Sequence, residues 1–495
     1  MKRRLYLPLT SIILCSACAV GPKYQRPVAP ATPSFKEMAG SDEWKTATPS
    51  DGQLKGKWWE IFNDPQLNEL EERVSTGNFT VKQMEAQFRA SRALVLGARA
   101  NYYPTIGASP SVGVTGVGGN GSRLGGTTGS FSIPFSATWV PDLWGRVRLA
   151  VEAANANAQV SAADLENARL ALQATLASDY FNLIGTDMEI ALLQDTIKAY
   201  ETYLTLTQNR YAGGVAAKSD VTLAQTQLFT TQANMTDLQV TRNQLEHAIA
   251  VTTGRAPAEL SIPAGRIAGS PPPIPVAVPS TLLERRPDIS AQERLIAAAN
   301  ANIGIAETAY YPTLSISASA ALTNSSFANL FTWASRVWSV GPTLSQTLFD
   351  FGRRHATVEN AEAIYDASVA AYRETVLSAF QQVEDNLSAL RVLAQESEQQ
   401  AAAVEAANTS LTLETDRYKA GTDSYLNVIT TQTIALSDQR EQVTLLQRRM
   451  VAAVNLIVAL GGGWDASALP NPDQIRSNGL AEPASTQKVA QPVTH

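Results

Sequence analysis

Residues 176–214 read LASDYFNLIGTDMEIALLQDTIKAYETYLTLTQNRYAGG and carry an aliphatic residue or a tyrosine at every seventh position. The positions of this repeat are Leu176, Leu183, Ile190, Ile197, Leu204 and Tyr211. The stretch belongs to a longer segment, residues 143–210, that contains no proline and is rich in Ala, Leu, Gln and Asn. This segment predicts one helix about 100 Å long, at about 1.5 Å per residue. A sustained seven-residue repeat predicts coiled-coil packing with a left-handed supercoil.

The long helix is predicted twice, because the chain contains an internal duplication. Arg210-Tyr211 recurs 207 positions later as Arg417-Tyr418, and Tyr102-Tyr103-Pro104-Thr105 recurs as Tyr310-Tyr311-Pro312-Thr313. The seven-residue pattern also recurs, with one polar interruption, at Val383, Leu390, Ser397, Val404, Leu411 and Tyr418. Duplicated sequence predicts structurally equivalent halves. The predicted organisation is a first repeat at 58–254, a proline-rich linker at 255–283, a second repeat at 284–463 and a C-terminal tail at 464–495.

Each long helix is expected to end at a glycine turn and to be followed by a shorter helix that runs back along it. Gly213-Gly214 and Gly421 provide the residue type that tolerates the positive φ of a tight turn. The predicted long helices span 143–210 and 351–418, and the predicted return helices span 219–253 and 424–460.

Each half also contains two strand-like segments, within predicted hairpins at 106–140 and 314–349. Apolar residues alternate there with Ser, Thr or Gly over about ten residues, which is typical of a tilted membrane strand and also of a half-buried soluble sheet. Pro134 and Pro342 disfavour a regular strand in either case. Two interpretations stand for the tryptophans beside the strands, an aromatic girdle at a membrane interface or core packing. These residues are Trp139, Trp144, Trp333 and Trp338.

The number of strands has a consequence for assembly. Four strands are too few to close a membrane barrel, and open sheet edges are not tolerated in lipid. Several chains must therefore share one barrel. The predicted fold class is a mixed α+β membrane protein in which a shared β-barrel continues into a tube of long helices.

The N-terminus has the layout of a secretory signal peptide at residues 1–17. Basic residues Lys2-Arg3-Arg4 precede an apolar stretch that is too short to span a membrane. The sequence Cys15-Ser16-Ala17-Cys18 resembles a bacterial lipobox, which predicts cleavage before Cys18, acylation of Cys18, and an extended lipidated segment at 18–57. The alternative is that both cysteines are ordinary residues of the signal peptide.

The composition excludes several classes of function. The formal net charge is -6, so there is no basic excess to neutralise phosphates and no nucleic-acid partner is expected. Three histidines and two cysteines offer little material for a metal site or a histidine-dependent triad. We therefore expect no enzyme activity, no cofactor and no metal. His247 and His355 are expected to be ordinary helix residues, and Gly116–Gly121 a surface hairpin loop, since no helix start follows it as in a phosphate-binding loop.

Five short motifs occur in order along the chain. They are Gly21-Pro22-Lys23-Tyr24-Gln25-Arg26-Pro27, Trp58-Trp59-Glu60-Ile61-Phe62-Asn63-Asp64-Pro65, Arg285-Arg286-Pro287-Asp288-Ile289, Trp338-Ser339-Val340-Gly341-Pro342 and Leu460-Gly461-Gly462-Gly463-Trp464. Together with the duplication, these motifs make the chain resemble the TolC-like outer-membrane efflux family, in the lipoprotein (OprM/NodT-like) branch that serves resistance nodulation division pumps. The resemblance implies a lipid-anchored homotrimer, with a twelve-stranded β-barrel in the outer membrane continuous with a long α-helical coiled-coil barrel in the periplasm.

The resemblance also implies a function and partners. The trimer is expected to be a passive exit duct for drugs or other small toxic compounds. It is expected to work with a periplasmic adaptor (membrane fusion) protein and an inner-membrane resistance nodulation division transporter. Two alternatives are a duct for type I protein or polysaccharide secretion and a non-transporting structural lipoprotein.

The functional residues that the resemblance implies lie at the two helix turns, the periplasmic tips. In the family, Arg-Tyr followed by Gly marks the tips, where the tunnel closes and the adaptor binds; the matching residues are Arg210, Tyr211, Gly214, Arg417, Tyr418 and Gly421. Ser219-Asp220 match a Thr-Asp pair that ties the closed tip in some members, but the opposing Arg position is Asp423, so that ionic latch is not expected. Leu426 matches a Leu that forms a narrow ring, and the ring Asp is replaced by Thr430, which implies an apolar gate with a weaker charge ring. The alternative for each polar tip residue is that it caps a helix.

Overall fold

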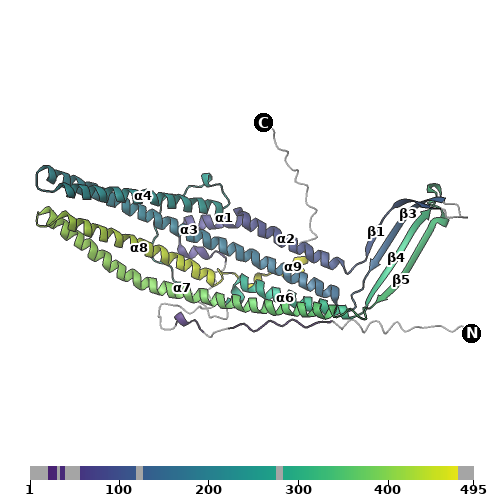
Figure 1. The fold of residues 1–495 in the computed structure, drawn as a ribbon. Coiled ribbons are helices and arrows are strands. Elements are labelled where there is room, and N and C mark those ends of the chain that lie inside the picture. The colour runs from purple at the N-terminus through teal and green to yellow at the C-terminus, as the bar shows by residue number, and fades with distance from the viewer. Residues whose placement is uncertain (1–19, 31–33, 39–55, 119–125, 275–281, 478–495) are drawn as a thin grey trace, which may run out of the picture.

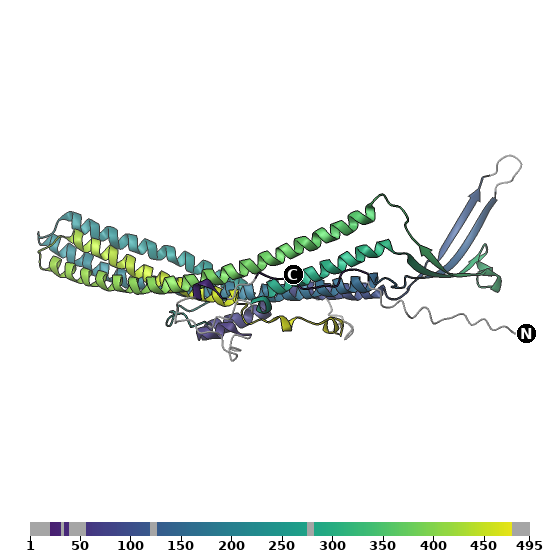
Figure 2. The same ribbon diagram turned by 90° about the horizontal axis from the view of Figure 1, so that it is seen from below.

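The chain forms an elongated body of long helices with a β-sheet at one end. The computed structural model describes residues 20–30, 34–38, 56–118, 126–274 and 282–477; the predicted signal peptide and Cys18 lie outside these ranges. Long helices run side by side over most of the length, the sheet extends from one end, and two helix turns lie at the other (Figures 1 and 2).

Each half contributes a helix before its strands, a long helix and a return helix. In the first half these are α2 (Phe79–Ala100), α3 (Arg146–Ala212) and α4 (Lys218–Thr252). In the second half they are α6 (Pro287–Glu307), α7 (Arg353–Lys419) and α8 (Tyr425–Ala459). The shorter helices are α1 (Pro65–Gly77), α5 (Leu282–Arg285) and α9 (Pro472–Ser477). Among the described residues, no helix combines the length and the apolar character needed to cross a membrane.

The two long helices have 67 residues each and begin slightly later than the sequence indicates. The residue before each helix is a glycine in the left-handed region, Gly145 with φ 84° and Gly352 with φ 89°. A carboxylate just upstream then accepts N–H groups of the first turn. Asp142 accepts from the N–H of Val147 at 3.0 Å and from the next residue, and Asp350 accepts from that of Arg354 at 3.2 Å. These acceptors satisfy donors that the helix start leaves free.

One antiparallel sheet contains β1 (Thr105–Ala108), β2 (Ser111–Val117), β3 (Gly126–Trp139), β4 (Thr313–Asn324) and β5 (Arg336–Ser345). Both β1 and β2 pair with β3, which pairs with β4, which pairs with β5. The first predicted strand is therefore interrupted at residues 109–110, because Pro110 has no N–H for the ladder. The second predicted hairpin extends to residue 349, but its last strand ends at Ser345. Pro134 and Pro342 nevertheless lie inside β3 and β5.

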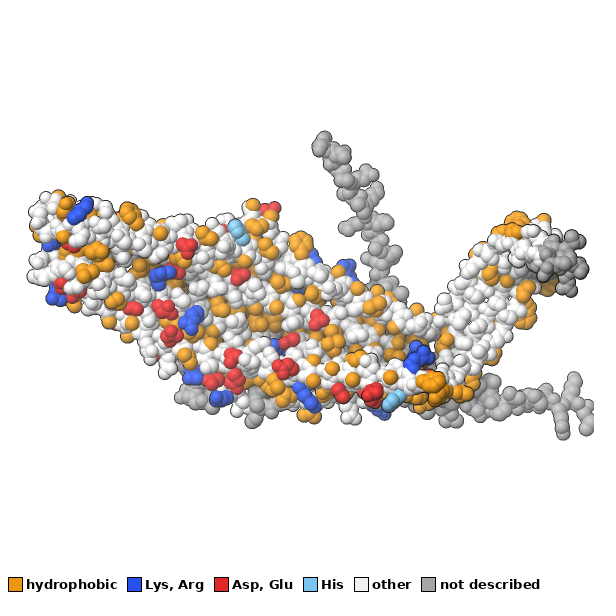
Figure 3. All heavy atoms as spheres, viewed as in Figure 1, with side chains coloured by type: hydrophobic (Ala, Val, Ile, Leu, Met, Phe, Trp, Pro, Cys, Tyr) orange, Lys and Arg blue, Asp and Glu red, His pale blue; other side chains and the backbone are white. Residues whose placement is uncertain are grey.

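The sheet carries apolar side chains that its own chain does not cover. Trp333 and Trp338 are 80% and 77% exposed, so core packing within the chain is wrong for these two residues. Trp144 and Trp139 instead tie the sheet to the helices, since their Nε1 atoms donate to the carbonyls of Pro312 at 2.7 Å and Tyr102 at 3.0 Å. On the face shown in Figure 3, the charged side chains lie over the helical body, and the described part of the sheet shows apolar and uncharged polar atoms.

The main hydrophobic core lies midway along the helical body. It is formed by α1, α3, α4, α6, α7 and α8 together with the 3-10 helix Trp58–Phe62. Its fully buried side chains include Trp58, Leu176, Leu183, Ile289, Tyr372 and Val383. Burying each of the aliphatic side chains contributes about 1.5 to 3 kcal/mol. The predicted seven-residue repeat lies on the buried face of α3 here, and becomes more exposed toward the turn, where Leu204 is half-buried and Tyr211 is exposed.

Glu71 in α1 is a buried carboxyl group whose two oxygens have no hydrogen-bond partner within the described part of the chain. Burial raises the pKa of Glu71 well above its usual value of 4.5. A raised pKa means that the folded state favours the protonated form. The stability linked to this proton is complete below the unfolded pKa and is lost as the pH rises through the folded pKa.

We therefore expect Glu71→Leu to raise the free energy of unfolding at pH 8 by about 1 to 4 kcal/mol, because it removes an unpaired buried carboxyl group. The gain should shrink at pH 5, because a lower pH favours the protonated form of Glu71. Thermal melting of both proteins at the two pH values measures this. Glu72→Leu is the matched control, since Glu72 is half-exposed and pairs with Lys57. An equal gain from both substitutions, or a gain independent of pH, would contradict the interpretation.

Candidate functional site

The two helix turns lie next to each other at the end of the helical body furthest from the sheet (Figures 1 and 2). Gly214 and Gly421 have φ values of 71° and 79°, which allow the chain to reverse immediately after α3 and α7. The N–H of Val215 donates to the carbonyl of Arg210 at 2.9 Å, and the N–H of Thr422 donates to that of Arg417 at 3.0 Å. The sequence therefore builds the same turn twice.

Arg210 connects the two turns. Its Nη1 donates to the carbonyl of Tyr418 at 2.8 Å and to that of Lys419 at 3.3 Å. The guanidinium also lies 4.6 Å from the centroid of the Tyr418 ring. A cation at the C-terminal carbonyls of a helix is favourable, because it satisfies unpaired acceptors and opposes the negative end of the helix dipole. Arg210 of the first half thus caps α7 of the second.

A small apolar core fixes this contact. Tyr418 and Tyr425 are buried, with ring centroids 5.2 Å apart, and they pack with Val428 and with Ala224 of α4. Burial raises the pKa of Tyr425, so this phenol stays neutral. The sequence analysis did not select Tyr425. Its position directly after the turn, in a segment otherwise rich in Thr and Asn, was the signal that could have identified it.

Arg417 and Asp423 interact within the second turn. Nη1 of Arg417 lies 3.0 Å from Oε1 of Glu414, and Nη2 lies 3.6 Å from Oδ2 of Asp423. Asp423 also accepts from the backbone N–H of Ser424 at 2.7 Å and from the Asn427 amide at 2.6 Å. These donors, the Ser424 N–H first, hold the pKa of Asp423 below its usual value. Asp423 therefore faces an arginine of its own turn.

The remaining predicted tip residues lie in the first turns of the return helices. Ser219 Oγ lies 3.5 Å from Asp220 Oδ1, and Ala217, the residue just before α4, makes no side-chain cap. Leu426 is 59% exposed in the first turn of α8. Thr430, one turn later and also exposed, donates its hydroxyl to the carbonyl of Leu426 at 2.9 Å. Leu426 and Thr430 therefore lie on one face of α8, where an apolar side chain is left uncovered by its own chain.

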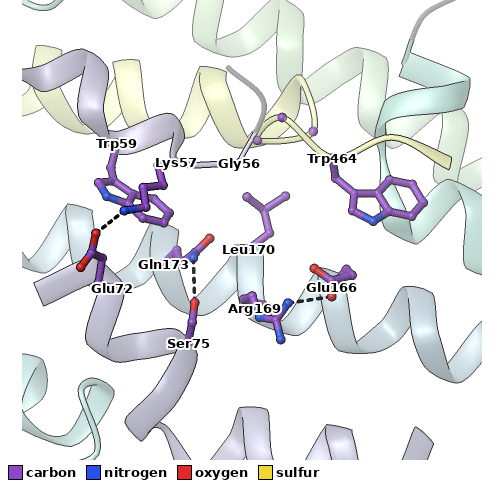
Figure 4. A pocket seen from close by; sticks show the side chains of 13 residues that line it. Gly56, Lys57, Trp59, Glu72, Ser75, Glu166, Arg169, Leu170, Gln173 and Trp464 are labelled. Atoms are coloured by element: carbon purple, nitrogen blue, oxygen red, sulfur yellow. Dashed lines mark hydrogen bonds and ion pairs between the residues drawn. The ribbon is translucent and has the colours of Figure 1, made fainter. Parts of the chain in front are cut away.

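A cavity of about 440 Å³ lies in the middle of the body, between α1, α3 and the segment after α8 (Figure 4). Its charged side chains interact with each other: Lys57 with Glu72, and Arg169 with Glu166 at 2.7 Å. Within the described ranges, no group of three or more His, Cys, Asp and Glu side chains is placed to hold a metal ion. The arrangement at the tip, with tied helix ends and an exposed apolar residue, is instead suited to contact between helices.

Comparisons with known proteins agree with this architecture. The family model described as "Outer membrane efflux protein" matches residues 72–255 and 278–462, one match for each half. The toluene efflux pump outer membrane protein TtgC of Pseudomonas putida is 30% identical over 467 residues, which cover 94% of this chain and 96% of TtgC. Outer membrane protein OprJ of Pseudomonas aeruginosa is 30% identical over 91% of this chain and 94% of OprJ.

Solved structures extend the comparison to the fold. The outer-membrane channel OprN superimposes with a TM-score of 0.83 at 28% identity, over 90% of this chain and 100% of that channel. The match includes both the helices and the sheet, so the mostly helical architecture with a smaller β part is that of TolC-like channels. The chain therefore belongs to the outer membrane efflux protein family, and it is the outer-membrane channel component of an efflux pump.

Proposed function

We propose that three copies of the chain close one continuous duct, a twelve-stranded barrel in the outer membrane followed by a coiled-coil barrel of helices in the periplasm. The observation that carries the proposal is the open sheet, in which β5 and the strand formed by β1 and β2 each have a single neighbour among the described residues. Unpaired backbone groups are too costly in lipid, and four strands cannot close a barrel. Helices of 67 residues carry the duct about 100 Å beyond the barrel.

The proposed pump has three components. The tip of the duct meets a periplasmic adaptor protein, which connects it to a resistance nodulation division transporter in the inner membrane. TtgC is named for toluene efflux, and we propose that this duct likewise passes drugs or other small toxic compounds. No chemical step is required of the duct itself, because the transporter supplies the driving force.

The function is tested by conductance and by export. Purified protein in a planar bilayer should conduct ions; a protein that folds and inserts without conducting would favour the structural lipoprotein. Deleting the gene should raise the accumulation of a small fluorescent dye and leave the amounts of secreted protein and polysaccharide unchanged. The reverse result would favour the secretion duct.

We propose the tip as the gate of the duct. Threefold assembly brings three copies of Asp220, Asp423 and Leu426 around one axis, where confinement strengthens the repulsion between like charges. Three copies of Leu426 form an apolar ring on the inner side of these carboxylates. Three copies of Thr430, which are uncharged, form the next ring. Ser219 supports Asp220 from the adjacent position.

We also propose that residues 1–17 are a cleaved signal peptide and that Cys18 carries a lipid. The next described residues support this placement, since the N–H of Val20 donates to the Trp144 carbonyl at 3.5 Å and the amide of Asn300 donates to the Pro22 carbonyl at 2.9 Å. The segment after Cys18 is thus held beside the junction between sheet and helices. A lipid at this end reaches the same membrane as the strands.

Cys18→Ser is expected to abolish labelling by palmitate while trimers largely persist, because closed strands hold the membrane more firmly than one anchor. Metabolic labelling and native gels measure the two results. Cys15→Ser is the control and should keep the label. Wild-type protein that takes up no palmitate would show that the cysteine is not a lipid site.

A further inference from the structure

The two tip arginines occupy equivalent positions of the duplication but make different contacts. Arg210 reaches out of its own turn and caps α7 through the carbonyls of Tyr418 and Lys419. Arg417 stays with Glu414 and Asp423 of its own turn. The first turn lacks both acidic groups, because Thr207 and Ala216 stand at the equivalent positions, 207 residues earlier.

The carbonyl groups that accept from Arg210 lie at the end of α7, and their equivalents lie at the end of α3. In the described part of a single chain, no arginine donates to these equivalent carbonyls from the other half. The residues matching Tyr418 and Lys419 are Tyr211 and Ala212, the last two of α3. The Tyr211 side chain is 45% exposed, whereas Tyr418 is 3% exposed. A Cβ at Gly421 would lie 3.7 Å from Nη2 of Arg210, whereas a Cβ at Gly214 would meet nothing within 4 Å. One turn is covered by an arginine of the other half, whereas in its copy the Tyr211 ring has Nζ of Lys218, from its own turn, 5.5 Å from its centroid.

We propose that Arg417 of one copy caps the C-terminal end of α3 in the next copy, above Tyr211 of the partner subunit. This inference rests on the proposed trimer. Within one chain, α3 of the first half packs against α8 of the second half. Because the halves are equivalent, the corresponding contact between copies places α7 against α4 of the partner subunit. Arg417, whose side chain is 59% exposed, lies in the last turn of α7, the helix that would meet the partner subunit in this arrangement. Six arginine caps then run around the tip, three within chains and three between them.

The caps between chains differ from those within chains in one respect. Glu414 and Asp423 compete for Arg417, whereas no carboxylate of its own turn competes for Arg210. Charge-assisted hydrogen bonds are the stronger kind, so this competition weakens the contact between chains. The tip therefore separates first between protomers, and Arg417 moves back to its own carboxylates when it does. The contact made by Arg210 keeps each protomer's two hairpins together.

Photo-cross-linking tests the contact directly. We replace Arg417 with p-benzoylphenylalanine in the full-length protein, irradiate the detergent-extracted trimer, and analyse it by denaturing gel and peptide mass spectrometry. The expected result is a ladder of dimer and trimer bands, with the adduct on the tryptic peptide of residues 211–218. The matched control replaces Arg210, and its adducts should stay within one chain, beside residues 418–421.

The experiment distinguishes a failure of the proposed cap from a failure of the proposed trimer. A native mass of three chains with adducts from position 417 only on residues 414–424 of the same chain would overturn the cap and leave the trimer intact. A monomeric native mass would overturn both. As a second measurement, Arg417→Gln should raise the open fraction of the channel about tenfold, and Glu414→Gln should lower it. A decrease with Arg417→Gln would contradict the proposal.

Discussion

Leu426→Ser is expected to raise the conductance of the isolated channel about tenfold or more and to make cells susceptible to vancomycin. Leu426 is 59% exposed in the single chain, although leucine gains about 1.5 to 3 kcal/mol from complete burial. In the proposed trimer, the three copies of Leu426 around the axis would cover one another, and each 1.4 kcal/mol lost from the closed state would shift the open fraction tenfold. Serine removes the apolar contact and admits water to the constriction.

Two controls separate the gate from general damage. Leu322→Ser changes a leucine of β4, at the opposite end of the molecule, and should leave conductance and vancomycin susceptibility unchanged. Leu413→Ser changes an equally exposed leucine on α7, before the turn, and should have a much smaller effect. Equal leakage from Leu426→Ser and Leu322→Ser, or no leakage from Leu426→Ser, would place the constriction elsewhere.

Gly461→Ala is expected to lower the free energy of unfolding by about 3 kcal/mol or more and to reduce the yield of folded protein sharply. Gly461 has φ 97°, and a Cβ there would lie 2.1 Å from the carbonyl oxygen of Arg285. Its counterpart Gly254 has φ 77°, and a Cβ there would lie 2.3 Å from the oxygen of Gly77. Each glycine follows a return helix, at a point where the backbone of another segment occupies the space that a Cβ would need.

Gly56→Ala is the matched control for this prediction. Gly56 has φ 98°, almost the same backbone strain, but a Cβ there would meet nothing within 4 Å. We expect it to cost about 1 to 2 kcal/mol, the strain alone. Thermal unfolding of the three proteins in one detergent measures the difference. If Gly461→Ala and Gly56→Ala lower the melting temperature equally, the close approach of the Arg285 carbonyl to Gly461 does not contribute to stability.

Much of this fold could be predicted from local patterns. The seven-residue repeat and the absence of proline indicated the long helices, and alternation with Ser and Thr indicated the strands. The boundaries could not be obtained this way. The start of α3 depends on the Asp142 carboxylate and the left-handed Gly145, and the break between β1 and β2 depends on Pro110, which the alternation around it conceals.

The tip was predicted less completely, because its contacts join residues that are distant in the sequence. The resemblance selected Arg210 and Tyr418 separately, but the cap requires the two turns to lie side by side, which only the packing of α3 against α8 achieves. The pairing of Asp423 with Arg417 was likewise outside the prediction. Tyr425 was missed because its burial depends on contacts with Tyr418 and with Ala224 of the other half, and its place directly after the turn was the one local signal.

The mass of the detergent-extracted particle tests the shared duct most directly. We predict three chains of 53.0 kDa, about 159 kDa less the signal peptides, measured by native mass spectrometry after the detergent has been removed. The same preparation should conduct ions in a planar bilayer. A particle that contains one chain and still conducts ions would contradict the shared barrel, because it would show that the sheet of a single chain is enough to form the channel.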